Sequence, residues 1–129
     1  MKLIVHESTP RHIAFTLQAP VAYANALRRT LLENIPTQAP DKIHITNNTS
    51  PLDNDMLTHR LGLIPTKQNN KLVFDCHIKN ETKESIDVYS HELHEDLMPN
   101  ILFVVLQPNQ ELEITVETVE GIARNHAKW

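Results

Sequence analysis

One stretch decides the fold of this chain: Tyr23-Ala-Asn-Ala-Leu-Arg-Arg-Thr-Leu-Leu-Glu-Asn-Ile-Pro36. Apolar residues recur at three- and four-residue spacing from Val21 to Leu31, and Pro36 ends the pattern. This spacing predicts an amphipathic helix of about four turns over residues 21–34. The helix would carry two adjacent arginines, Arg28 and Arg29, on its polar side.

A second stretch, His59-Arg-Leu-Gly-Leu-Ile-Pro65, follows a short gap and closes another predicted helix. Ser50 is a favourable N-cap residue, and Pro51 suits the first helical position, so we expect this helix to begin there. Gly62 can adopt a positive φ and suits the C-terminal cap, and Pro65 prevents the helix from resuming. Neither stretch contains a set of residues suited to catalysis.

The remaining sequence has the alternating pattern of half-buried strands. Strands are expected over residues 3–5, 11–18, 42–46, 72–78, 86–89, 101–106 and 112–116. The first two should form a hairpin, and the last four should form a small, mainly antiparallel sheet. The predicted fold class is therefore α+β.

Composition limits the functions that this chain can have. Its 129 residues fit one small core. Twelve basic and 16 acidic residues give a net charge of −4, which argues against direct, specific DNA contact. Two glycines exclude glycine-rich phosphate loops, so no nucleotide cofactor is expected. No apolar run reaches the roughly 20 residues that a membrane span needs, so we expect a soluble protein without membrane contact.

Cys76 is the only cysteine, so the chain can form no internal disulfide and has no CxxC pair for a zinc site. An intracellular, reducing setting is therefore expected. Cys76 lies on the apolar side of a predicted strand, where we expect a buried and unreactive thiol.

The order of four separated blocks resembles the α-like subunit of multisubunit RNA polymerase. The blocks are Ala24-Asn-Ala-Leu-Arg-Arg29, His59-Arg-Leu-Gly-Leu-Ile-Pro65, Val88-Tyr-Ser90 and Gly121-Ile-Ala-Arg-Asn-His-Ala-Lys-Trp129. The last block resembles the archaeal D or eukaryotic third-largest-subunit type rather than bacterial α. Each block alone is a weak signal, but the ordered set is specific and covers nearly the whole chain.

The resemblance implies a non-catalytic scaffold that pairs with a smaller L-type subunit. This heterodimer would be the platform for the largest and second-largest catalytic subunits. The implied organisation is a first part of the dimerisation module over residues 1–66, an inserted β-rich subdomain over residues 67–120, and a return segment over residues 121–129. The subunit-interface residues carried over from the family are Asn25, Leu27, Arg28, Arg29, Leu31, Leu32, His59, Arg60, Leu61, Gly62, Leu63, Ile64 and Pro65.

Arginine suits such an interface because its guanidinium presents five donors in a rigid fork. The alternative interpretation of Arg28 and Arg29 is a solvated helix face, which is the ordinary place for adjacent arginines.

Two features depart from the family. Its members often carry a cysteine-bearing metal loop or an iron–sulfur module in the inserted section, but Cys76 alone implies no metal. The family also continues past the closing His-Ala-Lys-Trp string into the rest of the dimerisation module. We therefore expect a fragment, a module completed by another polypeptide, or a pared-down subunit. The short, Asn-rich form favours a viral or otherwise divergent polymerase. The expected location is the nucleus or cytoplasm, or a virion for a viral polymerase.

Two alternatives from other classes remain open. Ser90-His-Glu-Leu-His-Glu-Asp96 could supply His91 and His94 to a metal-dependent hydrolase, although the spacing differs from HExxH. That hypothesis requires the two imidazoles to converge with a third ligand; otherwise the segment is an acidic surface turn. The second alternative is a self-associating adaptor unrelated to transcription, which requires a stable isolated oligomer.

Overall fold

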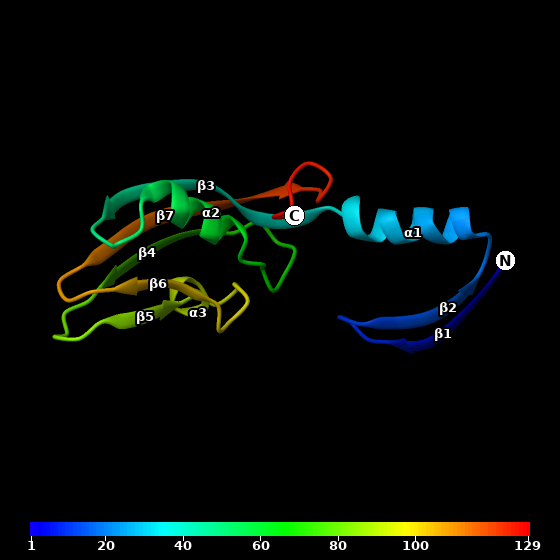
Figure 1. Cartoon of the computed structure of the whole chain (residues 1–129), viewed down its shortest axis with the longest axis horizontal. Coiled ribbons are helices and arrows are strands. Elements are labelled where there is room, and N and C mark those ends of the chain that lie inside the picture. The colour runs from blue at the N-terminus through cyan, green and yellow to red at the C-terminus, as the bar shows by residue number, and fades with distance from the viewer. The chain divides into compact units, whose positions relative to one another are not determined.

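The computed structural model describes all residues from Met1 to Trp129. The chain divides into two compact units, Met1–Ile35 and Pro36–Trp129. The predicted α+β class is confirmed, with mostly antiparallel strands and few helices (Figure 1). None of the helices is long and apolar enough to cross a membrane.

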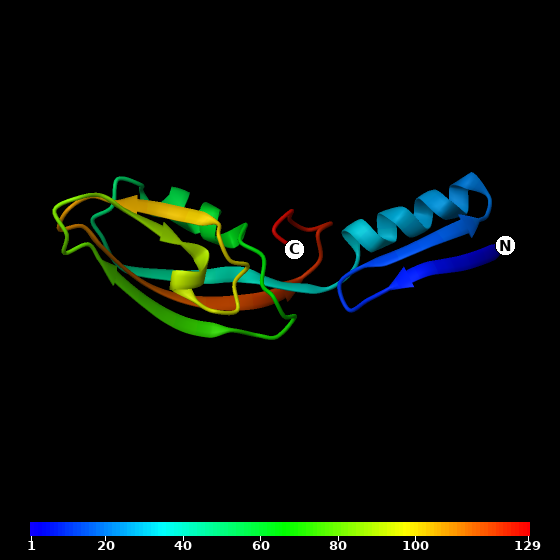
Figure 2. The same cartoon turned by 90° about the horizontal axis from the view of Figure 1, so that it is seen from below.

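The first unit contains a hairpin and one helix. Strand β1 (Lys2–Ser8) pairs antiparallel with β2 (Ile13–Gln18), and helix α1 (Val21–Glu33) follows. The predicted hairpin and helix are therefore both confirmed. Helix α1 lies alongside the hairpin, as both views show (Figure 2). No residue of this unit is buried.

The second unit contains two antiparallel sheets. The larger has the order β3 (Thr37–Asn48), β7 (Glu111–Gly121) and β4 (Val73–Lys79), so β7 is its central strand. The smaller pairs β5 (Ile86–Tyr89) with β6 (Leu102–Leu106). Helix α2 (Asn54–Gly62) contacts β3 and β6, and the short helix α3 (Ser90–Leu93) follows β5. The four strands predicted over residues 72–116 are confirmed, with shifts at their ends. The prediction that they form one sheet is wrong, because β4 and β7 join β3 whereas β5 and β6 pair only with each other.

One hydrophobic core lies in the second unit, and both sheets and α2 contribute to it. Its largest buried side chains include Phe103 from β6, Ile114 from β7, and Leu57 and Leu61 from α2. Alternation explains the contribution of β7, because Leu112, Ile114 and Val116 share one face while the residues between them face outward.

The predicted end of the second helix at Gly62 is confirmed, but its predicted start at Ser50 and the predicted cap role of Gly62 are wrong. Helix α2 begins after Asp53, whose side chain accepts a hydrogen bond of 2.8 Å from the backbone N–H of Met56. Ser50 instead donates its hydroxyl to Asn48 Oδ1 at 2.7 Å, which holds it in the preceding loop. Gly62 is the last helical residue and has no positive φ, because the chain leaves the helix through Leu63 in the right-handed region.

The predicted ranges 1–66, 67–120 and 121–129 follow the family's organisation and remain a prediction. In this structure, contacts divide the chain between Ile35 and Pro36. Strand β3, from the first range, pairs with β7, from the second, along most of its length.

Candidate interaction surfaces

The helix surface consists of the predicted interface residues on α1: Asn25, Leu27, Arg28, Arg29, Leu31 and Leu32. Leu31 is 48% exposed and Leu32 is 64% exposed, which is unusual for two neighbouring leucines on one helix. Leu27 is half-buried, because it shares a shallow pocket with Leu3 and Leu17 of the hairpin. The apolar side of α1 is therefore only partly covered within its own unit.

The two arginines of the helix surface are held along the helix by local partners. Arg28 donates from Nη2 to Asn25 Oδ1 at 2.9 Å. Arg29 donates from Nε and Nη2 to the Glu33 carboxylate at 3.2 and 3.3 Å, and this hydrogen bonding raises the pKa of Arg29. Both guanidinium groups are exposed, and each has further N–H donors available to a partner.

The turn surface comprises the predicted interface residues His59 to Pro65, and the structure divides them into two sets. Leu61, Gly62 and Ile64 are buried, and both Leu61 and Ile64 belong to the hydrophobic core. The exposed members are His59, Arg60, Leu63 and Pro65. The buried side chains anchor this turn to the core, so the exposed side chains project from a backbone that is held in place.

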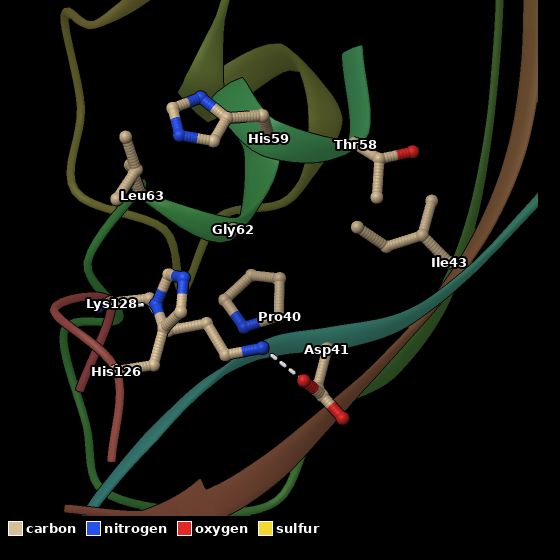
Figure 3. A pocket seen from close by; sticks show the side chains of 9 residues that line it. All are labelled: Pro40, Asp41, Ile43, Thr58, His59, Gly62, Leu63, His126 and Lys128. Carbon is tan, nitrogen blue, oxygen red and sulfur yellow. Dashed lines mark hydrogen bonds and ion pairs between the residues drawn. The ribbon is translucent and has the colours of Figure 1, made fainter. Parts of the chain in front are cut away.

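A pocket of about 170 Å³ opens beside the turn surface (Figure 3). His59 of α2 and Leu63, directly after that helix, line one side of it, and His126 and Lys128 line it from the return segment. The ammonium of Lys128 forms an ion pair with the Asp41 carboxylate of β3, drawn as a dashed line in Figure 3. The return segment is therefore tied to the strand beside the turn surface.

Trp129 strengthens the attachment of the return segment. Its indole Nε1 donates a hydrogen bond of 2.9 Å to the carbonyl oxygen of Val119. The Lys128 ammonium lies 4.5 Å from the centre of the indole ring, within the range of a cation–π contact. Sequence reasoning missed the roles of Asp41 and Lys128, because the two residues lie far apart in the chain and carry no motif of their own.

His91 and His94, the two histidines of the alternative hydrolase hypothesis, do not converge with a third ligand. No group of three or more histidine, cysteine, aspartate or glutamate side chains could hold a metal ion. His94 stacks on Phe74 with ring centres 4.6 Å apart, and His91 stacks on Tyr89 at 6.0 Å. The hydrolase hypothesis thus lacks the geometry that it requires.

The prediction for Cys76 is confirmed. Its side chain belongs to the core and is 7% exposed. Burial, with a smaller contribution from the negative charge of Glu92, raises the pKa of the thiol to about 11. The thiol is therefore protonated at neutral pH and is a poor nucleophile.

Sequence comparison finds relatives of this chain among the subunits of DNA-directed RNA polymerases. No protein-family model matches the chain. The chain is 36% identical over 124 residues to DNA-directed RNA polymerase subunit Rpo3 of Methanocaldococcus jannaschii, which covers 89% of this chain and 63% of that protein. It is 32% identical over 145 residues to the Rpo3 of Pyrococcus horikoshii, covering 100% of this chain and 56% of the relative.

Eukaryotic proteins also match. The chain is 28% identical over 155 residues to subunit RPAC1 of human DNA-directed RNA polymerases I and III, covering 84% of this chain and 45% of that protein. The chain thus spans about half the length of the curated relatives that it matches.

Proposed function

Because this chain belongs to the α-like subunits of the archaeal D and eukaryotic subunit-3 type in DNA-directed RNA polymerases, we propose that it acts as a non-catalytic assembly subunit of such a polymerase. Its role is to pair with an L-type subunit and to form the platform for the two large catalytic subunits. The metal-dependent hydrolase and the unrelated adaptor gain no support from the relatives.

The observation that carries this proposal is the absence of any buried residue in Met1–Ile35. A two-stranded hairpin is marginally stable alone in water, and so is a helix of this length. The unit nevertheless exposes many large apolar side chains: Leu3, Ile4, Val5, Ile13, Val21, Tyr23, Leu31, Leu32 and Ile35. This many exposed apolar side chains favour association with another protein.

The helix surface is the proposed contact with the L-type partner. Leu31 and Leu32 supply apolar area that is exposed in this chain. Arg28 and Arg29 each hydrogen-bond to a neighbour on the same helix and still present free N–H donors to a partner. Carboxylates and backbone carbonyls of the partner are the groups that such arginines bind best.

The turn surface is the proposed contact with the second-largest subunit. Leu63 is 46% exposed although it lies between the buried Gly62 and Ile64. A rigid turn that presents an apolar side chain between an imidazole and a proline is a suitable anchor for a protein interface, because little conformational entropy is lost on binding.

The test is affinity purification of the tagged chain from its native cells, followed by mass spectrometry. Wild type is compared with an Arg28→Ala, Arg29→Ala variant, and an Arg11→Ala, Arg124→Ala variant is the matched control that removes two exposed arginines elsewhere. We expect wild type and control to recover both large polymerase subunits. The Arg28→Ala, Arg29→Ala variant should recover about tenfold less of both large subunits, because it loses hydrogen-bonded charges at the interface. Absence of polymerase subunits from the wild-type sample would overturn the proposal.

A further inference from the structure

An apolar groove lies between the loop that precedes α2 and strand β6. Its volume is about 160 Å³. Six residues line it: Pro51, Leu52, Arg60, Leu102, Val104 and Val105. Arg60 is the only charged residue among them, and no carboxylate faces the groove.

Arg60 is fixed at the groove by a single contact. Its Nη2 donates a hydrogen bond of 2.9 Å to the carbonyl oxygen of Leu102. A guanidinium has five N–H donors, so most of its hydrogen-bonding capacity is free. No aspartate or glutamate of the chain forms an ion pair with it. Asp53, at the start of the same helix, accepts a hydrogen bond from the backbone N–H of Met56 as the cap of α2.

The groove therefore combines an apolar floor with an uncompensated, oriented positive charge. The apolar walls favour one aliphatic or aromatic side chain, and the guanidinium favours a carboxylate, which it can bind with two hydrogen bonds. A phosphate-rich ligand fits less well, because nucleic acids are bound by clusters of cations and this groove has one.

We infer that this groove binds a short polypeptide segment of a partner subunit that carries an aspartate or glutamate beside an apolar side chain, with the carboxylate paired to Arg60. The inference rests on the proposed function for the partner and adds the chemistry of the bound segment. Arg60 then acts through charge, whereas Leu63 on the same turn acts through apolar contact.

The test places a photoreactive benzophenone side chain at the exposed rim position Pro51 in the tagged chain. Illumination of the purified complex, followed by mass spectrometry, identifies what lies in the groove. We expect a cross-link to one segment of one polymerase subunit, with an acidic residue next to an apolar one. Arg60→Glu should reduce the cross-link about tenfold, and the matched charge reversal Arg124→Glu should not. Reversing the partner's acidic residue to lysine should restore the cross-link to Arg60→Glu.

Two outcomes would overturn the inference and leave the proposed function intact. In one, both large subunits are recovered but no cross-link forms; in the other, the cross-linked segment lacks an acidic residue. Equal effects of Arg60→Glu and Arg124→Glu would overturn it as well.

A second measurement tests peptide binding to the groove in the free chain, and it does not depend on recovery of the polymerase subunits. A capped hexapeptide of leucine, glutamate and serine is titrated into the full-length chain and followed by NMR, beside the same peptide with lysine in place of glutamate. We expect saturable shifts of the Leu102 and Val104 amides with the acidic peptide only, and their loss in Arg60→Glu. Equal responses to the two peptides, or no response to either, would contradict the inference. Thermal melting of Arg60→Glu confirms that the variant remains folded.

Discussion

The indole ring of Trp129 occupies the space that a side chain on Gly121 would need. A Cβ atom at Gly121 would lie 2.4 Å from both Cδ2 and Cε2 of that ring. Backbone conformation does not require glycine here, because its φ is not positive. Gly121 thus permits the close approach that lets Trp129 bond to Val119 and holds the return segment in place.

We predict that Gly121→Ala displaces the indole. The variant should lose about 1–3 kcal/mol of unfolding free energy, because the new methyl group clashes and the indole hydrogen bond breaks. Trp129 is the only tryptophan, so the emission maximum of its fluorescence reports on its environment directly. A shift to longer wavelength before any unfolding transition is the expected result.

The only other glycine supplies a matched control. A Cβ atom at Gly62 would lie 3.6 Å from the carbonyl oxygen of Pro40, which is an ordinary contact. Alanine is favoured over glycine in a helix by about 0.5–1 kcal/mol, so Gly62→Ala should leave stability unchanged or raise it slightly. Similar losses of stability in the two variants would show that the indole contact is not the cause.

Cys76 gives a prediction about pH. Burial raises the pKa of its thiol to about 11 in the folded chain, above the ordinary value of 9.0. The folded state therefore binds the proton more tightly than the unfolded state, and this contribution to stability is complete below pH 9 and declines as the pH rises towards 11. Cys76→Ala should therefore lose less unfolding free energy than wild type as the pH rises from 9 to 11. Urea unfolding of both proteins at several pH values would measure this difference.

The same residue should resist chemical modification. At pH 8 a thiol-specific disulfide reagent should react with unfolded chain in urea and scarcely with the native chain, because the buried thiol is protonated. Rapid labelling of native protein would contradict the burial of Cys76.

The parts of the fold that follow from local periodicity could be predicted from sequence. Helix α1 was predicted within one residue of its observed bounds, and the alternation over residues 112–116 identified strand β7, which continues to Gly121. The start of α2 was predicted three residues too early, because the cap was assigned to Ser50 and not to Asp53. Ser50 satisfies every local rule, but its hydroxyl is used by Asn48, which leaves Asp53 to cap the helix.

The candidate surfaces were only partly predictable, because burial depends on long-range packing. The stretch from His59 to Pro65 has one local pattern, yet Leu61 faces the core and Leu63 faces outward. The groove at Arg60 depends on a carbonyl of Leu102, 42 residues away. No short-range signal in the sequence indicates that contact.

The exposed leucines of α1 should matter for association and little for folding. Leu32→Ala should change the unfolding free energy by less than about 0.5 kcal/mol, because Leu32 is 64% exposed. Leu57→Ala, at a side chain that is 1% exposed, should cost about 2–5 kcal/mol. Chemical denaturation of both variants tests this contrast.

Self-association of the free chain is expected from the same surface. In sedimentation experiments the isolated wild-type chain should form dimers or larger species, because its apolar helix surface is uncovered. Leu31→Ser, Leu32→Ser should shift the distribution towards monomer. An unchanged distribution would place the self-associating surface elsewhere.

Amide hydrogen exchange in the free chain should be much faster in Met1–Ile35 than in strand β7. Amides of β1, β2 and α1 should exchange through local opening at low free-energy cost, because no side chain of Met1–Ile35 is buried. Amides of β7 should exchange only through global unfolding, because β7 is the central strand of its sheet and supplies Leu112, Ile114 and Val116 to the core. Binding of an L-type partner to the helix surface should slow exchange in α1 selectively, by linkage between binding and local stability. Equal protection of α1 and β7 in the free chain would mean that the first unit is stable without a partner, which would remove the main physical support for the assembly role.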